Sequence, residues 1–107
     1  MPYNEELAGR VRSLLRGRAD VTEKEMVGGL AFLLRGKMCV GVRRDNLLIR
    51  VGPDRYEQAP GRSHARKVDS TGRPMRGWVY VDPRGTQAGE DLARWVAQAV
   101  GFVESLR

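Results

Sequence analysis

Apolar and polar residues alternate through residues 24–51, KEMVGGLAFLLRGKMCVGVRRDNLLIRV, which indicates short antiparallel strands joined by tight turns. Successive side chains of a strand point to opposite faces, so apolar residues of one parity share a face. A three-residue turn at 35–37 and a tight turn at Arg44-Asp45 would bring three such sets together. That face would hold Leu30, Phe32, Leu34, Met38, Val40, Val42, Leu47, Ile49 and Val51, and the other would hold Ala31, Leu33, Cys39, Gly41, Leu48 and Arg50.

Two amphipathic helices are predicted to cover the apolar face. The first, residues 4–16, has Asn4 as its N-cap, and Arg10, Arg12 and Arg16 are expected to face solvent. The second spans residues 88–106, and Gly101 within it suggests a close approach to a strand. The expected buried stripes are Leu7, Val11, Leu14 and Leu15 in the first helix, and Leu92, Trp95, Val96, Ala99, Val100, Val103 and Leu106 in the second.

The remaining segments add two strands and a long loop. An edge strand is expected at 23–27 and a last strand at 77–81, which is aromatic and β-branched. Residues 54–59 are predicted to form a helical turn, and the polar residues 61–76 an irregular loop. Trp78 and Trp95 are expected to pack in the core. The predicted class is α+β, an antiparallel meander flanked by an N-terminal and a long C-terminal helix, in one domain spanning 1–107.

Composition places the chain among ordinary globular proteins, with 107 residues of which 41% are apolar and 30% charged. No apolar run approaches the roughly 20 residues of a membrane span, and the first residues lack the apolar core of a secretion signal. We therefore expect no membrane partner. The single cysteine, Cys39, cannot form an internal disulfide, which favours a reducing cytoplasm.

Positive charge is concentrated in the middle of the chain. The net charge is +6, and residues 35–76 hold eleven basic side chains against four acidic ones. Such an excess attracts polyanions or an acidic protein, although net charge also serves solubility. Trp78 and Tyr80 would stack bases if they faced solvent beside Arg73 and Arg76. The candidate residues for contact with a partner or nucleic acid are Arg43, Arg44, Arg62, His64, Arg66, Lys67, Arg73 and Arg76.

No motif for catalysis or for metal binding is present in the sequence. His64 has neither the nucleophile-elbow signature nor an evident orienting acid, and Cys39 has no Cys or His at metal-ligand spacing. Gly28-Gly29 is not followed by the Lys-Ser/Thr of a phosphate loop. We expect no catalytic residue, no metal and no cofactor.

Ordered motifs carry a family resemblance. They are YNEEL at 3–7, TEKEMVGGLAF at 22–32, GKMC at 36–39, LLIRV at 47–51 and GRPMRGWVYV at 72–81, followed by the terminal helix with Trp95. Together they resemble the N-terminal domain of the TfoX/Sxy family, bacterial regulators of natural competence, over nearly the whole chain. Val27 departs from the aromatic residue often found there. The resemblance implies a secretion-chaperone-like α+β fold. It also implies full-length relatives with a second helical domain, which act with the cAMP receptor protein at certain promoters.

The leading interpretation is a non-enzymatic cytoplasmic regulatory module that contacts a protein partner through its basic loop and sheet surface. The alternative is weakly specific nucleic-acid binding through the basic region Arg35–Arg76, which would weaken steeply with salt. The third hypothesis is a small enzyme, which would need Cys39 or His64 beside a polar group in a pocket. We also expect a homodimer, because a small meander leaves an edge strand and a half-apolar face exposed.

Overall fold

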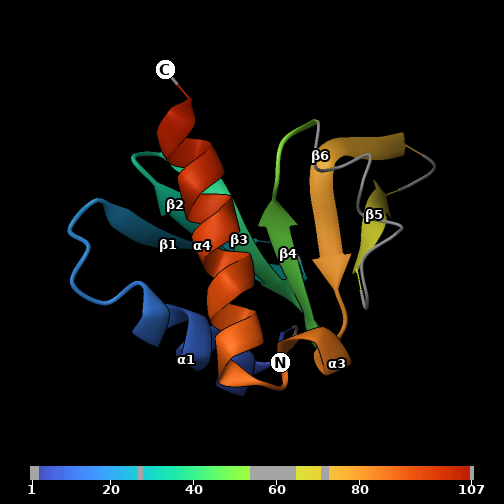
Figure 1. Cartoon of the computed structure of the whole chain (residues 1–107), viewed down its shortest axis with the longest axis horizontal. Helices are drawn as coiled ribbons and strands as arrows, with labels where there is room; N and C mark the ends of the chain where they lie inside the picture. Colours follow the sequence, from blue (N-terminus) through green and yellow to red (C-terminus); the bar gives the residue numbers. More distant parts are fainter. Residues whose placement is uncertain (1–2, 27, 54–64, 71–72, 107) are drawn as a thin grey trace.

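The computed structural model describes residues 3–26, 28–53, 65–70 and 73–106, and its framework is one antiparallel sheet (Figure 1). The strand order across the sheet is β1-β2-β3-β4-β6-β5, with every neighbouring pair antiparallel. The predicted α+β class is therefore confirmed. The elements are α1 (Glu5–Leu14), β1 (Val21–Met26), β2 (Gly29–Leu34), β3 (Lys37–Arg43), β4 (Asn46–Arg50), β5 (Ala65–Ser70), β6 (Arg73–Val81), α3 (Pro83–Thr86) and α4 (Gly89–Ser105).

The strands β5 and β6 correct the prediction of an irregular loop over 61–76. Residues 65–70 form β5, and β6 begins at Arg73. β6 pairs with β4, and β5 pairs with the outer side of β6, so β5 is an edge strand. Because an edge strand needs no alternation of apolar residues, its polar sequence gave no strand signal. The helical turn expected at 54–59 lies outside the described residues.

The hairpin between β2 and β3 has a shorter turn than the sequence predicts. Arg35 and Gly36 have φ angles of 54° and 82°, and Leu34 pairs with Lys37 instead of Met38. Two residues with positive φ are typical of the hairpin turn whose twist matches that of the strands. Taken alone, the shorter turn would move the apolar residues of β3 to the wrong face of the sheet.

A bulge in β3 restores the register after this turn. The pairing shifts between Phe32 and Leu33, and Cys39 is the extra residue on β3. Cys39 is consequently fully buried in the core cluster, whereas Met38 is half-buried opposite Leu33. The predicted faces of Cys39 and Met38 are therefore wrong, because a bulge interrupts strict alternation. The predicted pairs that hold are Leu30–Val42, Phe32–Val40, Val42–Leu47 and Val40–Ile49.

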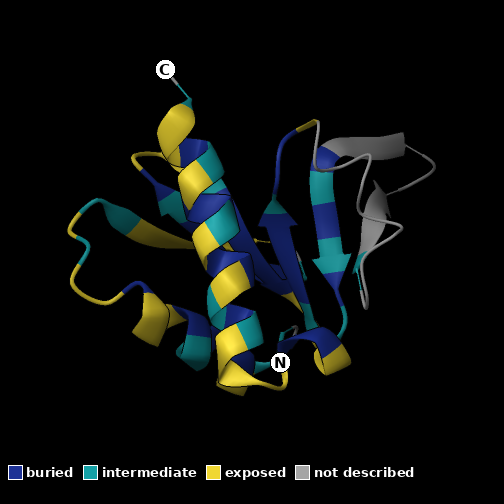
Figure 2. Cartoon of the chain, viewed as in Figure 1, coloured by how far each residue is buried: buried dark blue, intermediate teal, exposed yellow. Residues whose placement is uncertain are grey.

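The helix α4 crosses the sheet in front of β2, β3 and β4, and α1 and α3 lie beside its N-terminal half (Figure 1). The core fills the space between α4 and the sheet, where the ribbon is dark blue in Figure 2. Phe32, Val40 and Ile49 are at most 1% exposed. The buried residues of α4 are Leu92, Trp95, Val96, Ala99, Val100 and Val103, as predicted, while Leu106 follows the helix and is half-buried.

The helix α1 begins as predicted, because the Asn4 side chain accepts a hydrogen bond from the Leu7 amide at 3.0 Å. Leu7, Val11 and Leu15 are buried, but Leu14 is 43% exposed, so its predicted place in the core is wrong. No helix among the described residues is long and apolar enough to cross a bilayer.

Gly52, which lies beside α4, and Gly101, which lies within it, differ in their surroundings. A Cβ at Gly52 would overlap the Phe102 ring, and Gly52 has a φ of +88°. A Cβ at Gly101 would meet nothing within 4 Å. The close approach to a strand expected at Gly101 is therefore wrong, and the close contact with α4 is made by Gly52.

We predict opposite effects for alanine at these two positions. Gly52→Ala should lower the free energy of unfolding by about 2 kcal/mol or more, through its left-handed φ and the overlap with Phe102. Gly101→Ala should raise it by about 0.5–1 kcal/mol, because alanine favours an exposed helix position. Urea unfolding measures both, and equal effects of the two substitutions would contradict this packing.

Candidate functional site

The sheet has a second face, opposite the core, whose residues alternate with core residues along β2, β3, β4 and β6. We call it the second sheet face. Ala31 and Leu48 are 1% and 6% exposed without belonging to the core cluster, which is consistent with this placement. The other large side chains are half-buried. The residues of the second sheet face are Ala31, Leu33, Met38, Gly41, Leu48, Trp78 and Tyr80.

Met38 covers Gly41 on the second sheet face. A Cβ at position 41 would lie 2.8 Å from Met38 Cε and 3.5 Å from Leu48 Cβ, so the glycine leaves room that the Met38 side chain fills. Methionine is unbranched and has three rotatable bonds, which lets it adapt to irregular surfaces. This part of the face is therefore apolar and deformable. The sequence signal for this position is the pair Arg35-Gly36. A two-residue turn there pairs Met38 with Leu33 and so places Met38 on the second sheet face.

Arg43 and Tyr80 form a polar group beside this apolar surface. Arg43 Nη1 donates a hydrogen bond to Tyr80 Oη at 3.3 Å, which connects β3 with β6 across β4. The Arg43 side chain is exposed and Tyr80 is half-buried. A guanidinium and a phenol at the margin of an apolar surface can give orientation to a bound molecule.

Trp78 lies on the second sheet face and not in the core, so the predicted core position is wrong. Val79 and Val81 take the core positions of β6, at 1% and 0% exposure, and strand alternation turns Trp78 away from them. The Arg50 guanidinium carbon lies 5.9 Å from the Trp78 ring centroid and 5.7 Å from that of Phe102. Arg50 thereby links β6 to the last turns of α4. Trp95 is 7% exposed in the core, as predicted.

The hairpin tip between β3 and β4 carries the candidate residues Arg43 and Arg44, both exposed. Arg44 has a φ of 54°, and its carbonyl oxygen accepts a hydrogen bond from the Asn4 amide at 2.7 Å. Asn4 Nδ2 donates to Asp45 Oδ1 at 3.1 Å. These contacts hold the tip against the start of α1, so its arginines extend from a fixed backbone.

The other candidate residues divide between the two ends of β6. Arg66 pairs with Tyr80 and Lys67 with Val79, which places these β5 positions near the Arg43 end of the sheet. Arg73 pairs with Ser70 at the far end of the hairpin, seven residues or about 23 Å along β6 from Tyr80. Arg76 lies between these ends in sequence. Arg62 and His64 lie outside the described residues.

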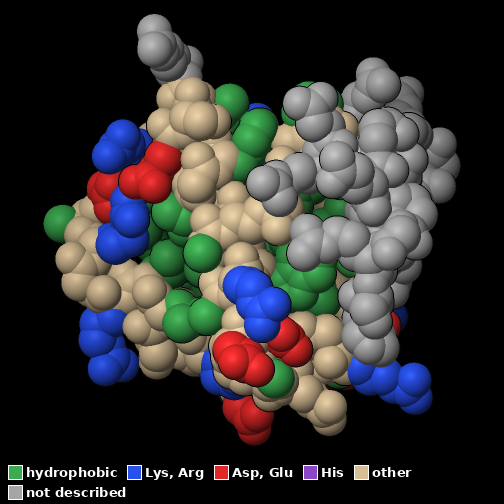
Figure 3. Space-filling model, viewed as in Figure 1, with side chains coloured by type: hydrophobic (Ala, Val, Ile, Leu, Met, Phe, Trp, Pro, Cys, Tyr) green, Lys and Arg blue, Asp and Glu red, His purple; other side chains and the backbone are tan. Residues whose placement is uncertain are grey.

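The basic region Arg35–Arg76 is consequently not a single patch in the described part of the chain. Arg35 and Lys37 lie at one end of β3 and Arg43 and Arg44 at the other, roughly 20 Å apart. On the side that carries the helices, basic and acidic side chains are interspersed (Figure 3). Charge that is concentrated in the sequence is separated in space, because successive hairpin turns lie at opposite ends of a sheet.

The arginines of α1 have more specific surroundings than solvent. Arg10 Nη2 donates to the carbonyl oxygen of Thr86 at 2.6 Å, at the end of α3, where carbonyl groups lack partners within the helix. Arg12 makes two hydrogen bonds with the carboxylate of Glu23, at 2.6 and 2.8 Å. Arg12 and Arg16 are exposed as predicted, and Arg12 is also ion-paired, whereas Arg10 is half-buried and its predicted solvent exposure is wrong.

Cys39 is a buried thiol whose surroundings do not suit a nucleophile. Its Sγ donates to the carbonyl oxygen of Phe32 at 3.6 Å, and its exposure is 0%. Burial disfavours the thiolate and raises the pKa of Cys39 to about 11. Among the described residues, no group of three or more His, Cys, Asp or Glu side chains is placed to hold a metal ion.

We predict that Cys39 is inert in the folded protein. At pH 8 its reaction with Ellman's reagent should be more than about a hundredfold slower than in guanidinium chloride, because a pKa of about 11 leaves little thiolate and burial blocks access. Release of thionitrobenzoate over time measures this. Equal rates in the native and denatured states would show that the bulge exposes the thiol.

Comparison with known protein families identifies a match over most of the chain. The model of the TfoX N-terminal domain matches residues 13–103, which extend from the last residues of α1 to the last turn of α4. No curated protein and no solved structure matched the chain. The chain belongs to the TfoX N-terminal domain family.

Proposed function

We propose that this domain is a non-enzymatic regulatory module that acts by binding a protein partner through the second sheet face. The observation that carries the proposal is the set of side chains gathered there. Met38, Trp78, Tyr80 and Arg43 represent the residue types that are enriched in protein–protein interfaces. They come from β3 and β6, far apart in sequence, and the sheet brings them to one surface.

The face combines an apolar centre with a polar margin. Half-buried Met38 supplies apolar surface over Gly41 and the buried Leu48, and Arg43 hydrogen-bonds Tyr80 at the margin of this face. Interfaces commonly have such an apolar core within a polar rim. Membership of the TfoX N-terminal domain family supports a regulatory role of the kind that competence regulators perform. The burial of Cys39 supports the absence of covalent catalysis at the described thiol.

Nucleic-acid binding is the second candidate, and Arg43 beside Tyr80 is the observation that favours it. An aromatic ring with a neighbouring cation is a common platform for stacked bases. Trp78 is less suited, because Arg50 already lies over its ring. The separation of Arg35 and Lys37 from Arg43 and Arg44 also reduces the number of phosphates that one bound strand would contact.

We predict that Arg43→Glu removes partner capture. In a pull-down from an extract of the native cells, tagged protein carrying this change should lose its captured proteins, whereas Arg84→Glu should retain them. Arg84 is an exposed arginine on α3, away from the second sheet face, and serves as the matched control. A further bait with Arg62, Arg66 and Lys67 changed to Glu tests the contribution of the basic loop. The proposal fails if the Arg43→Glu bait captures the same proteins as the unaltered domain.

For nucleic acid, we predict weak binding without sequence preference and strong salt dependence. Fluorescence anisotropy with labelled duplex and single-stranded oligonucleotides should show any affinity at 25 mM salt fall by tenfold or more at 150 mM, about the loss expected for a few phosphate contacts. Absence of binding at 25 mM salt would remove this candidate. Affinity that persists at 150 mM with a clear base preference would make it the leading function.

A further inference from the structure

The strand β1 is the edge of the sheet farthest from β5, and its outer side is unpaired within the described structure. It pairs with β2 through six residues, Val21 to Met26. Five of these six residues are exposed, and Val21 is half-buried. A free edge presents backbone amides and carbonyls that another extended chain can use.

The charges of β1 disfavour pairing with β1 of a second copy. Two identical strands related by a two-fold axis perpendicular to the sheet keep the same faces aligned. Centred on Lys24, this pairing sets Lys24 opposite itself and Glu23 opposite Glu25. Centred on Glu23 or on Glu25, it sets that carboxylate opposite itself. Like charges directly opposite one another are destabilising, so each of these registers is opposed.

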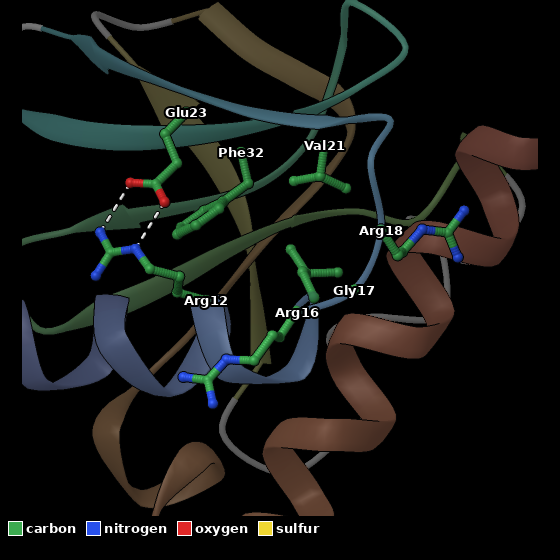
Figure 4. A pocket seen from close by; sticks show the side chains of 8 residues that line it. Arg12, Arg16, Gly17, Arg18, Val21, Glu23 and Phe32 are labelled. Carbon is green, nitrogen blue, oxygen red and sulfur yellow. Dashed lines mark hydrogen bonds and ion pairs between the residues drawn. The ribbon is translucent and has the colours of Figure 1, made fainter.

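A hollow of about 340 Å³ lies beside β1, between this strand and the end of α1 (Figure 4). Leu15, Val21 and Phe32 line its apolar part. Val21 and Glu23 belong to β1 and face the same side of the sheet as Phe32, with which Glu23 pairs. A side chain from a strand added to β1, on the face that carries α1, would therefore lie at this hollow.

Arginines surround the hollow, and one of them is unengaged. Arg12 and Glu23 form an ion pair across it, and hydrogen bonding to Arg12 holds the pKa of Glu23 below its usual range. Arg18 is bonded to Asp20 and Glu104. Arg16 is exposed, lines the hollow, and has no acidic partner among the described residues. Figure 4 shows the Arg16 guanidinium directed away from Val21 and Glu23, so an incoming carboxylate meets this cation when the exposed side chain turns toward the hollow.

We propose that β1 binds an extended acidic segment of a partner protein as an added antiparallel strand. One carboxylate of the segment lies opposite Lys24, on the face away from the helices. A second acidic side chain, opposite Val21, places its methylene groups over the apolar part of the hollow and its carboxylate at Arg16. The segment is uncharged opposite Glu25. Lys24 pairs with Ala31 and so continues the second sheet face onto β1, whereas the contact at Val21 lies on the opposite side of the sheet and neither contact uses Arg43.

Charge complementarity selects this occupant over a second copy of the chain. Lys24 and Arg16, which have no acidic partner among the described residues, point to carboxylates on both faces of the added strand. The sequence of β1 offers carboxylates at Glu23 and Glu25, which both lie on the same face. A second β1 strand therefore cannot supply the pattern that this edge requires.

The test uses the peptide Ac-Ser-Val-Thr-Glu-Thr-Val-Glu-Ser-NH2 as probe, with both glutamates changed to lysine as the control peptide. Titration of the isotope-labelled full chain should shift the backbone amide resonances of Val21–Met26 with the acidic probe and not with the basic one. Lys24→Glu and Arg16→Glu should each weaken binding about three- to tenfold, as expected when an attractive cross-strand pair becomes repulsive. Lys37→Glu, at an exposed position outside this edge, should leave affinity unchanged.

Backbone pairing is tested separately from charge. Two further probes carry N-methyl groups at alternate residues, one at the odd and one at the even positions. Methylation should abolish binding of the probe whose methylated amides face β1 and leave binding of the other probe intact. Equal binding of both methylated peptides would overturn strand addition, as would equal effects of Lys24→Glu and Lys37→Glu. Absence of binding at millimolar probe, or sedimentation showing a dimer in which the β1 amides are protected, would overturn the proposal as well. None of these results depends on Arg43, so failure here and failure of the second sheet face are distinguishable.

Discussion

The packing of α4 against one face of the sheet is the interaction on which the rest of the structure depends. Apolar side chains of α4 meet those of β2, β3 and β4 in a single core cluster. Fully burying a leucine or valine contributes about 1.5–3 kcal/mol, so Leu92 and Val96 alone account for a substantial part of the stability of a small domain. Since one face of the sheet is used in this way, the other is left to carry the candidate interface.

The bulge at Cys39 shows how strongly this packing constrains the strands. The turn at Arg35-Gly36 is one residue shorter than a continuous apolar face would need, yet Val40 and Val42 still reach the core. One extra residue on β3 reconciles a favourable turn with a favourable core. The consequence for function is the position of Met38, which the shorter turn places on the second sheet face and which precedes the bulge that returns Val40 to the core.

Most of the fold could be predicted because its signals are local. Alternation of apolar residues predicted β2, β3 and β4. The Asn4 cap predicted the start of α1, and helical periodicity predicted the buried residues of α4. The strand β5 was not predictable, since an edge strand is defined by its pairing with β6 and not by its own pattern. The candidate site was predicted less well. Alternation along β6 allowed either Trp78 and Tyr80 or Val79 and Val81 to face the core. In the structure the two valines are buried in the core, so Trp78 and Tyr80 lie on the other face. The distance between Arg35 and Arg43 follows from their places at opposite ends of β3, which their spacing in the sequence does not show.

Native-state hydrogen exchange measured residue by residue tests most directly whether α4 and the sheet form one cooperative core. We expect the slowest amides of α4, β2, β3 and β4 to exchange with one common free energy of opening, equal to that of global unfolding. Amides at the outer side of β1 should exchange with much lower free energies. A single core is contradicted if the amides of α4 exchange together at a clearly lower free energy than those of the three central strands, because the sheet would then remain folded without its helix.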